Sequence, residues 1–121
     1  MTSPSNNATR SPAELAQAQL DAYNAKDLDA FCACYAEEVR VWRMPDPMPR
    51  TSGISSFRES YAGGPFANPA IRAEVRERLV MGSKVVDYEW VHGRSAEAQP
   101  VMVVYHCRDG LIHEVYFFSP D

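Results

Sequence analysis

The sequence has little that would point to nucleic acid, membranes or secretion. Twelve lysines and arginines stand against 16 aspartates and glutamates, for a formal net charge of −4, whereas a nucleic-acid-binding surface needs a basic excess. No apolar run approaches the roughly 20 residues of a membrane-spanning helix, and residues 1–10 hold no apolar segment of the secretory type. We therefore expect no nucleic-acid partner, no membrane partner and a cytoplasmic location.

Cofactor, metal and disulfide motifs are also missing. No glycine-rich phosphate loop, nucleophile elbow or zinc-ligand spacing is present. The three cysteines, Cys32, Cys34 and Cys107, are an odd number without the spacing of a disulfide framework. Such usage fits free, buried thiols in a reducing compartment. The sequence thus predicts no cofactor and no metal.

A globular α+β domain is what the remaining pattern predicts. The chain has 121 residues, 45% of them apolar, which suits a flexible tail over residues 1–10 and a single domain over 11–121. Helices are expected from the Ser11/Glu14 capping box, from Asp27 as an N-cap, and over residues 53–62. The buried stripe of the second helix should be Leu28, Phe31, Cys32 and Tyr35.

Strands are predicted over Val39–Met44 and in two hairpins. The first hairpin, residues 71–92, turns at Gly82-Ser83, and the second, residues 101–118, turns at Asp109-Gly110. Two-residue turns would set the cross-strand partners. These partners are Arg78 with Asp87, Arg76 with Glu89, Val104 with Val115, Met102 with Phe117, and His106 with His113.

The first hairpin has two unlike faces. One face is apolar and aromatic: Val75, Leu79, Val86, Tyr88 and Trp90. The other carries Arg76, Arg78, Asp87 and Glu89. If the charged face looks inward, it supplies polar groups to a cavity; if it looks outward, the charges are a solvated cross-strand ion-pair ladder. The pattern alone leaves both arrangements open.

Three segments together resemble a known family: LDAYNAKDLDAFCACYAEEVRVW, TSGISSFRESYAG and VVYHCRDGLIHEVYFF. They are similar to the SnoaL-like and ketosteroid-isomerase-like branch of the NTF2-like superfamily. The resemblance implies an α+β cone, in which a curved antiparallel sheet wraps around three helices and a central cavity. It also implies a homodimer formed through the outer face of the sheet, and it implies no single reaction.

The same resemblance argues against ordinary ketosteroid isomerisation. Those isomerases use a tyrosine on the first helix, an aspartate base after the first strand and a protonated aspartic acid on the penultimate strand. The aligned residues here are Gln19, Arg43 and Val104. None of the three can take the corresponding role.

The resemblance also favours one orientation of the strands. It turns Asp87 and Glu89 into the cavity together with Arg76 and Arg78. The outer face, and with it the dimer interface, would then hold Tyr88, Trp90, Tyr105, Tyr116 and Phe118. So many exposed aromatic side chains would be a liability on a monomer.

From this orientation we predict an acid–base site. Asp87 and Glu89 are the candidate catalytic residues, and Arg78 would orient Asp87, because burial raises and a neighbouring arginine lowers the pKa of a carboxyl. The ligand-binding candidates are Tyr35, Met44, Phe57, Tyr61, Met102, Val104, His106, His113, Val115 and Phe117. Facing histidines can share a metal, but no third ligand stands at a helpful spacing, so none is predicted.

Two functions remain open at this point. The first is a small-molecule enzyme of the SnoaL-like isomerase, cyclase or hydrolase type, which acts on an apolar organic substrate. The second is a non-catalytic ligand-binding or dimerisation module. Burial of Asp87 and Glu89 is the feature that would favour the first.

Overall fold

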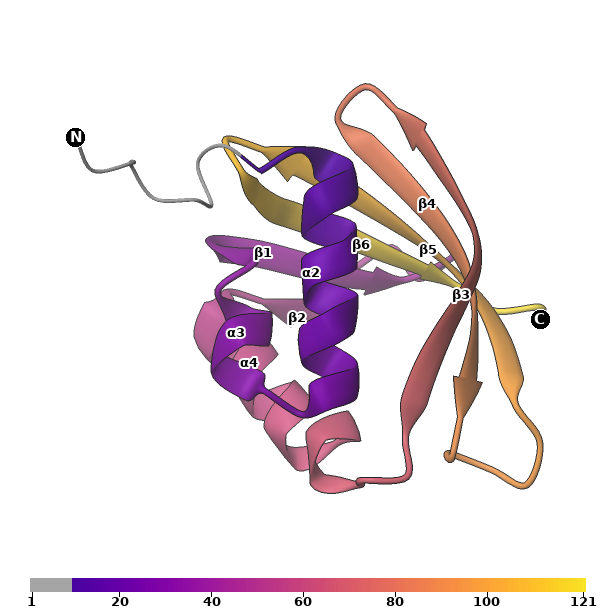
Figure 1. Ribbon diagram of the computed structural model, residues 1–121. Coiled ribbons are helices and arrows are strands. Elements are labelled where there is room, and N and C mark those ends of the chain that lie inside the picture. The colour runs from indigo at the N-terminus through magenta and orange to yellow at the C-terminus, as the bar shows by residue number, and fades with distance from the viewer. Residues whose placement is uncertain (1–9) are drawn as a thin grey trace.

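Three helices and a six-stranded mixed sheet make up the fold of the computed structural model, which describes residues 10–121 (Figure 1). The elements are α2 (Pro12–Ala25), α3 (Leu28–Cys32), β1 (Tyr35–Arg43), β2 (Thr51–Ser52), α4 (Ile54–Gly63), a 3-10 turn η1 (Pro65–Ala67), β3 (Arg72–Met81), β4 (Lys84–His92), β5 (Gln99–Arg108) and β6 (Leu111–Phe118). This confirms the predicted α+β class. The predicted tail lies outside the described residues, apart from Arg10.

The helices begin where the sequence places their caps. In α2 the Ser11 hydroxyl accepts the Glu14 amide at 3.1 Å, and the Glu14 carboxylate accepts the Ser11 amide at 2.8 Å. Asp27 likewise caps α3 by accepting the Ala30 amide. Within residues 10–121 no helix is long and apolar enough to cross a membrane.

The second helix is shorter than predicted. Tyr35 does not lie on it but is the first residue of β1. The carbonyl of Cys34 accepts the Ile112 amide of β6 at 2.9 Å, which draws the chain into the sheet. The helical spacing of Tyr35 with Phe31 was therefore misleading, because a contact with a strand far along the chain ends the helix.

The sheet has the strand order β2-β1-β6-β5-β4-β3. All neighbouring strands are antiparallel except β1 and β6, which are parallel, so the purely antiparallel sheet of the prediction is wrong at that one pair. The sheet curves, and α2 runs across its concave face (Figure 1). Asn24, near the end of α2, is hydrogen-bonded to both the amide and the carbonyl of Ala73 in β3, at 2.8 and 2.9 Å.

A bulge in β3 changes the register of the first hairpin. Arg78 faces Asp87 as predicted, but Val75, not Arg76, faces Glu89. Arg76 is the extra residue of the bulge. Its guanidinium lies 4.7 Å from the ring centre of Trp90 on the outer face, so the prediction that Arg76 points inward is wrong.

A second bulge, in β6, reverses the predicted orientation of β5. The pair Cys107–Ile112 follows the two-residue turn, but His106 then faces Glu114 and Tyr105 faces Val115, so His113 is the extra residue. Buried Val103 and Tyr105 therefore face inward, and Met102, Val104 and His106 face outward, contrary to prediction. Tyr105 is consequently not part of the outer face.

An aromatic cluster fills one end of the space between helices and sheet. The rings of Phe31 and Phe57 stack with 5.6 Å between centres, and Tyr35 lies 4.4 Å from Phe57. The cluster is completed by Tyr23, Tyr61 and Phe66. The cluster thus packs α3 and α4 against the sheet, and four of its members, Tyr23, Phe31, Tyr35 and Tyr61, also line the neighbouring pocket.

Gly93 ends β4 in close contact with the segment before β3. A Cβ atom built there would lie 1.9 Å from the carbonyl oxygen of Ala70, and its φ angle is +87°. Only glycine fits both conditions. The tight approach fixes where the loop after β4, which begins with Arg94, leaves the sheet.

We expect Gly93→Ala to lower the free energy of unfolding by about 2–4 kcal/mol, from the strained φ angle and the steric overlap together. Urea denaturation followed by circular dichroism measures it. Gly53→Ala is the matched control, because Gly53 has nearly the same φ of +90° but open space around its Cβ position. At φ 90° and ψ 150° the strain alone costs about 1–3 kcal/mol, so this variant should lose less than Gly93→Ala, which adds the steric overlap. Equal losses in the two variants would contradict the role given to the Ala70 contact.

Candidate active site

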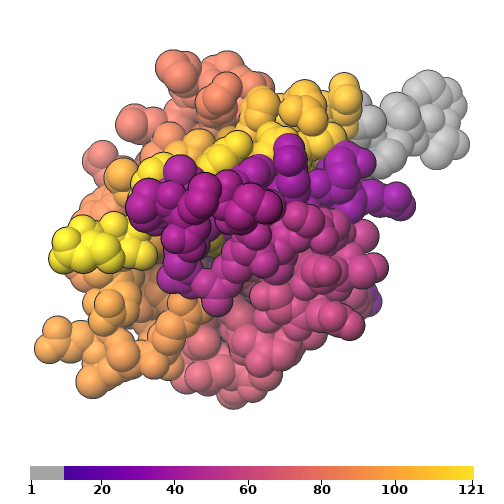
Figure 2. Space-filling model, turned by 180° about the vertical axis from the view of Figure 1, so that it is seen from behind, coloured from indigo at the N-terminus to yellow at the C-terminus, as the bar shows by residue number. Residues whose placement is uncertain are grey.

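A pocket of about 500 Å³ lies between α2, the concave face of the sheet and the α4–η1 segment. Figure 2 shows the face on which the segment after β1, the loop after β4 and the C-terminal residues border a hollow. The pocket is lined by Gln19, Leu20, Tyr23, Phe31, Tyr35, Val41, Arg43, Arg50, Thr51, Ser60, Tyr61, Gly64, Pro65, Ala73, Glu89, Val91, Arg94, Gln99, Pro100, Val101, Tyr105, Val115, Phe117, Ser119 and Pro120.

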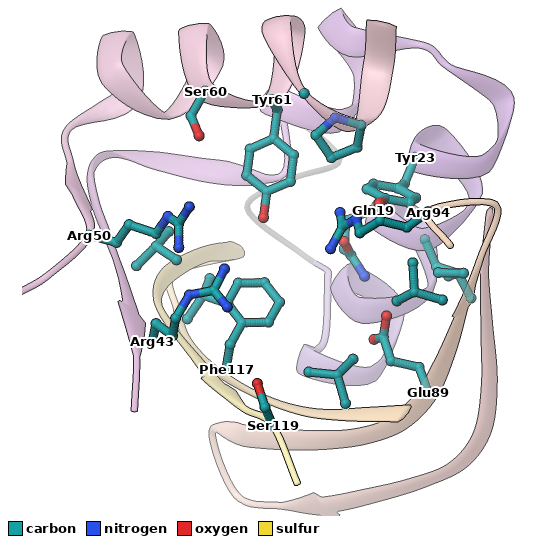
Figure 3. A pocket seen from close by; sticks show the side chains of 18 of the residues that line it. Gln19, Tyr23, Arg43, Arg50, Ser60, Tyr61, Glu89, Arg94, Phe117 and Ser119 are labelled. Atoms are coloured by element: carbon teal, nitrogen blue, oxygen red, sulfur yellow. The ribbon is translucent and has the colours of Figure 1, made fainter. Parts of the chain in front are cut away.

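Glu89 is the acidic residue of this pocket. It comes from the middle of β4, is 7% exposed, and points into the pocket (Figure 3). Its Oε2 atom is buried and has no hydrogen-bond partner within residues 10–121. Burial, and next the charge of Asp87, raise the pKa of Glu89 to about 8, although Arg78 acts in the opposite direction.

Asp87 is held in a different way. It is completely buried, and its two carboxylate oxygens accept hydrogen bonds from Arg78 Nε at 2.7 Å and Nη2 at 3.0 Å. Arg78 also donates to the side-chain oxygen of Gln17 on α2 at 2.9 Å. Asp87 does not line the pocket. The pair therefore bonds β3, β4 and α2 together and acts on Glu89 from behind.

A hydrogen-bonded chain of three side chains forms another wall. The Tyr35 hydroxyl donates to Oε1 of Gln19 at 3.1 Å, and Nε2 of Gln19 donates to the Tyr105 hydroxyl at 3.0 Å and to the Ala16 carbonyl at 3.0 Å. Because the Tyr105 oxygen accepts the amide, its own proton is free to be donated towards the pocket. Burial raises the pKa of Tyr35 and Tyr105 well above 10, so both hydroxyls are neutral donors.

Tyr61, from α4, points its hydroxyl into the centre of the pocket (Figure 3). The hydroxyl has no hydrogen bond to any residue in 10–121. Burial is the main cause that raises its pKa, and the charges of Tyr23 and Glu89 add to it. Tyr61 is thus a second neutral donor near Glu89.

Three arginines also line the pocket: Arg43 at the end of β1, Arg50 just before β2, and Arg94 in the loop after β4. All three side chains are exposed at its mouth. Within residues 10–121 none of them forms an ion pair or side-chain hydrogen bond. The pocket therefore has a cationic mouth and one buried acidic group.

The SnoaL-like domain family matches residues 16–115, which include nearly the whole described fold. The chain belongs to the SnoaL-like family. No curated protein sequence is significantly similar to it.

Solved structures share the fold of this chain. A protein from Kribbella flavida DSM 17836, provisionally assigned as a ketosteroid isomerase, is 21% identical with a TM-score of 0.80, over 91% of this chain and 78% of that one. An NTF2-like protein of unknown function from Cytophaga hutchinsonii ATCC 33406 is 13% identical with a TM-score of 0.76, over 98% and 94%. A computationally designed 17-OHP binder is 15% identical with a TM-score of 0.78, over 89% and 93%. At these identities the likeness shows the NTF2-like fold alone.

Some of the predicted ligand-binding residues line the pocket, and others lie in the core or on the outer face of the sheet. Four of them line the pocket, namely Tyr35, Tyr61, Val115 and Phe117. Phe57 is fully buried in the aromatic cluster, and Met44 follows β1 outside the pocket lining. Met102, Val104 and His106 lie on the outer face, as described above.

The two histidines do not face each other. His106 Nδ1 lies 2.7 Å from Glu114, and His113 Nδ1 lies 3.3 Å from Glu38 and 3.1 Å from Arg108. The prediction that they form a facing pair at the pocket rim is wrong, because the bulge at His113 separates them. Among the described residues, no three His, Cys, Asp or Glu side chains are grouped to hold a metal ion.

Several pocket residues had little or no signal in the sequence. Gln19 and Arg43 were noticed only because they replace isomerase residues in the family alignment. Arg50 and Arg94 belong to irregular segments, where no periodicity gives a direction to the side chain. The sequence pattern predicts the wrong face for Tyr105, because nothing in the sequence indicates the bulge in β6.

The raised pKa of Glu89 predicts an unusual pH dependence of stability. The native protein keeps a proton on Glu89 up to about pH 8, whereas the unfolded chain releases it near pH 4.5. The native state thus binds more protons in this window, so the Glu89 contribution to stability falls as the pH rises. Relative to Glu89→Gln, the free energy of unfolding of the wild type should fall by about 2–4 kcal/mol between pH 5 and pH 9.

Chemical denaturation of both proteins across this pH range measures the difference. All other titrating groups are shared, so they cancel in the comparison. Glu59→Gln, which removes an exposed carboxylate from α4, should keep the wild-type pH dependence. A constant difference between wild type and Glu89→Gln would show that the pKa of Glu89 is ordinary.

Proposed function

We propose that this SnoaL-like protein is an acid–base enzyme that moves a proton next to the carbonyl group of a small, largely apolar organic molecule. The observation that carries the proposal is Glu89, a buried carboxyl with an unpaired oxygen that faces the pocket. A pKa of about 8 lets one group both remove and return a proton near neutral pH. Buried titratable groups of this kind concentrate at catalytic sites.

The proposed reaction has two proton transfers, one from the substrate to Glu89 and one back. Ionised Glu89, about a tenth of the molecules at pH 7, takes a proton from the carbon beside the carbonyl. The electron pair of the broken C–H bond forms an enolate, whose oxygen accepts a hydrogen bond from the Tyr61 or Tyr105 hydroxyl. Glu89, Tyr61 and Tyr105 all line the same pocket, and the charge of Glu89 is one of the causes that raise the pKa of both tyrosines. Glu89 then returns the proton to the same or a neighbouring carbon, without any oxidation.

Asp87 and Arg78 are positioning residues in this proposal. Both carboxylate oxygens of Asp87 accept hydrogen bonds from Arg78, and Asp87 does not line the pocket. Of the two predicted acid–base residues, we therefore propose Glu89 alone for proton transfer. The charge of Asp87 raises the pKa of Glu89, and that of Arg78 lowers it. Burial and this pair together thus set the pH at which Glu89 works.

The test uses 2-tetralone, an apolar bicyclic ketone with acidic protons next to its carbonyl. We expect the protein to catalyse exchange of these protons in deuterium oxide, with a rate that rises around pH 8 as Glu89 ionises. Proton NMR measures the loss of signal. In Glu89→Gln the protein-dependent rate should fall at least about 100-fold, because general base catalysis contributes roughly that factor or more.

Two further variants complete this experiment. Glu59→Gln should exchange at the wild-type rate, since it removes a distant, exposed carboxylate. Asp87→Asn should keep exchange activity but shift the midpoint of the pH profile downwards, because Arg78 then acts on Glu89 without opposition. Unchanged exchange in folded Glu89→Gln would overturn the proposed function. Binding of 2-tetralone without any exchange would favour a non-catalytic ligand-binding module.

We also propose a homodimer through the outer face of the sheet. This face carries Trp42, Tyr88, Trp90, Met102, Val104, Tyr116 and Phe118. Met102 pairs with Tyr88 on one side and with Phe118 on the other, and the three are 46%, 38% and 37% exposed. A contiguous apolar patch across three strands is more than a monomer usually exposes.

Sedimentation velocity of the wild type should give about twice the 13.6 kDa chain mass at micromolar concentration. Met102→Glu places a charge at the centre of the patch and should give a monomer. Met48→Glu is the control, because Met48 is 72% exposed in the loop after β1 and should leave the dimer intact. A monomeric wild type would refute the interface.

A further inference from the structure

The unpaired cations of the chain gather at the pocket. Seven of the twelve lysines and arginines have a side-chain hydrogen bond or an ion pair within residues 10–121: Arg10, Lys26, Arg40, Arg58, Arg76, Arg78 and Arg108. The other five are Arg43, Arg50, Arg72, Lys84 and Arg94, and three of these five line the pocket. In a protein of net charge −4, this is an uneven distribution of free positive charge.

Arg43 and Arg50 are brought to the same side by the backbone. The Arg50 amide donates to the carbonyl of Val41 at 2.6 Å, so the segment after β1 returns alongside β1 and brings Arg50 to the part of β1 that ends with Arg43. Figure 3 shows both guanidinium groups reaching into the pocket from one side, opposite Glu89. Arg94 stands at the mouth beside Tyr23 and adds to the positive field.

Nothing in the described pocket neutralises these charges. Glu89 is its one acidic lining residue, and the raised pKa leaves that carboxyl mostly uncharged at neutral pH. Guanidinium groups are forks of N–H donors that match the oxygens of a carboxylate or phosphate. Two of them on one side of a pocket make a positive field that attracts an anion.

We propose that the ligand of this pocket is an organic anion, whose carboxylate or phosphate group is bound by Arg43 and Arg50 while its apolar body extends towards Glu89. The inference rests on the same pocket as the proposed function and adds the substrate class. It concerns binding, so it holds or fails independently of whether Glu89 moves a proton. The apolar body would lie against Phe117, Val115 and Tyr61, which line the space between the two sides.

Two fluorescent probes with nearly the same aromatic skeleton test the proposal. 1-Anilinonaphthalene-8-sulfonate carries an anionic group, and N-phenyl-1-naphthylamine lacks it. We expect the wild type to bind the anionic probe about tenfold more tightly or better, as one charge-assisted contact provides. Arg43→Gln and Arg50→Gln should each lose about that factor for the anionic probe and keep their affinity for the neutral one.

Arg72→Gln is the matched control, because Arg72 is also exposed and unpaired but lies outside the pocket. It should bind both probes as the wild type does. Equal affinity of the wild type for the two probes would overturn the proposal. An anionic affinity that both pocket variants retain would overturn it too, since the probe would then be bound elsewhere, such as on the outer face.

Competition against the anionic probe distinguishes the oxyanion. Naphthalene-1-carboxylate and 1-naphthyl phosphate are compared with neutral 1-naphthalenemethanol. The stronger of the two anions identifies the preferred group, and no advantage of either over the alcohol would overturn the inference. Glu89→Gln should retain the preference for anions, so loss of proton exchange in that variant leaves the binding result intact, and the two proposals are tested separately.

Discussion

Burial of an ionisable carboxyl without a partner is the constraint on which the site depends. The charged form of Glu89 is disfavoured because the pocket removes water and provides no hydrogen bond to one of its oxygens. The neighbouring Asp87 avoids this cost through its bidentate contact with Arg78. Two carboxyl groups on the same strand and the same face are therefore held differently: Asp87 accepts two hydrogen bonds from Arg78, and Glu89 carries a proton that it can lose.

Glu89 lies on a strand whose backbone is held on both sides by neighbouring strands. Alternation along β4 turns Val85, Asp87, Glu89 and Val91 to the concave face, with β3 and β5 paired on either side. Asn24 fixes the end of α2 to β3, and the close contact of Gly93 with Ala70 ends β4. The position of Glu89 is thus determined by backbone geometry and not by a partner of its own.

Local chemistry made helix starts and tight turns predictable, whereas tertiary contacts decided where the second helix ends and which way several side chains face. The Ser11 capping box and the Asp109-Gly110 turn depend on near neighbours, and both are present as predicted. The bulges at Arg76 and His113 have no comparable signature, yet each shifts the register by one residue and so reverses a strand face. Burial of Glu89 was predicted because the family resemblance oriented β4 and the bulges leave that strand intact. Arg50 and Arg94 come from loops, and only the folded chain brings them into the lining of the pocket that holds Glu89.

Arg43 and Arg50 lie on one side of the pocket and Glu89 on the other, and this arrangement would affect which atom of a bound ligand reacts. An anion held by Arg43 and Arg50 would offset the positive charge on that side of the pocket. The reaction would still begin from the ionised fraction of Glu89, whose size depends on burial and on the Asp87–Arg78 pair behind it. The anchor on one side and the acid on the other give a ligand two fixed points. The apolar surface between the two arginines and Glu89 then needs few specific contacts with the ligand. The distance from the arginines to Glu89 would select which carbon of the bound ligand lies next to Glu89.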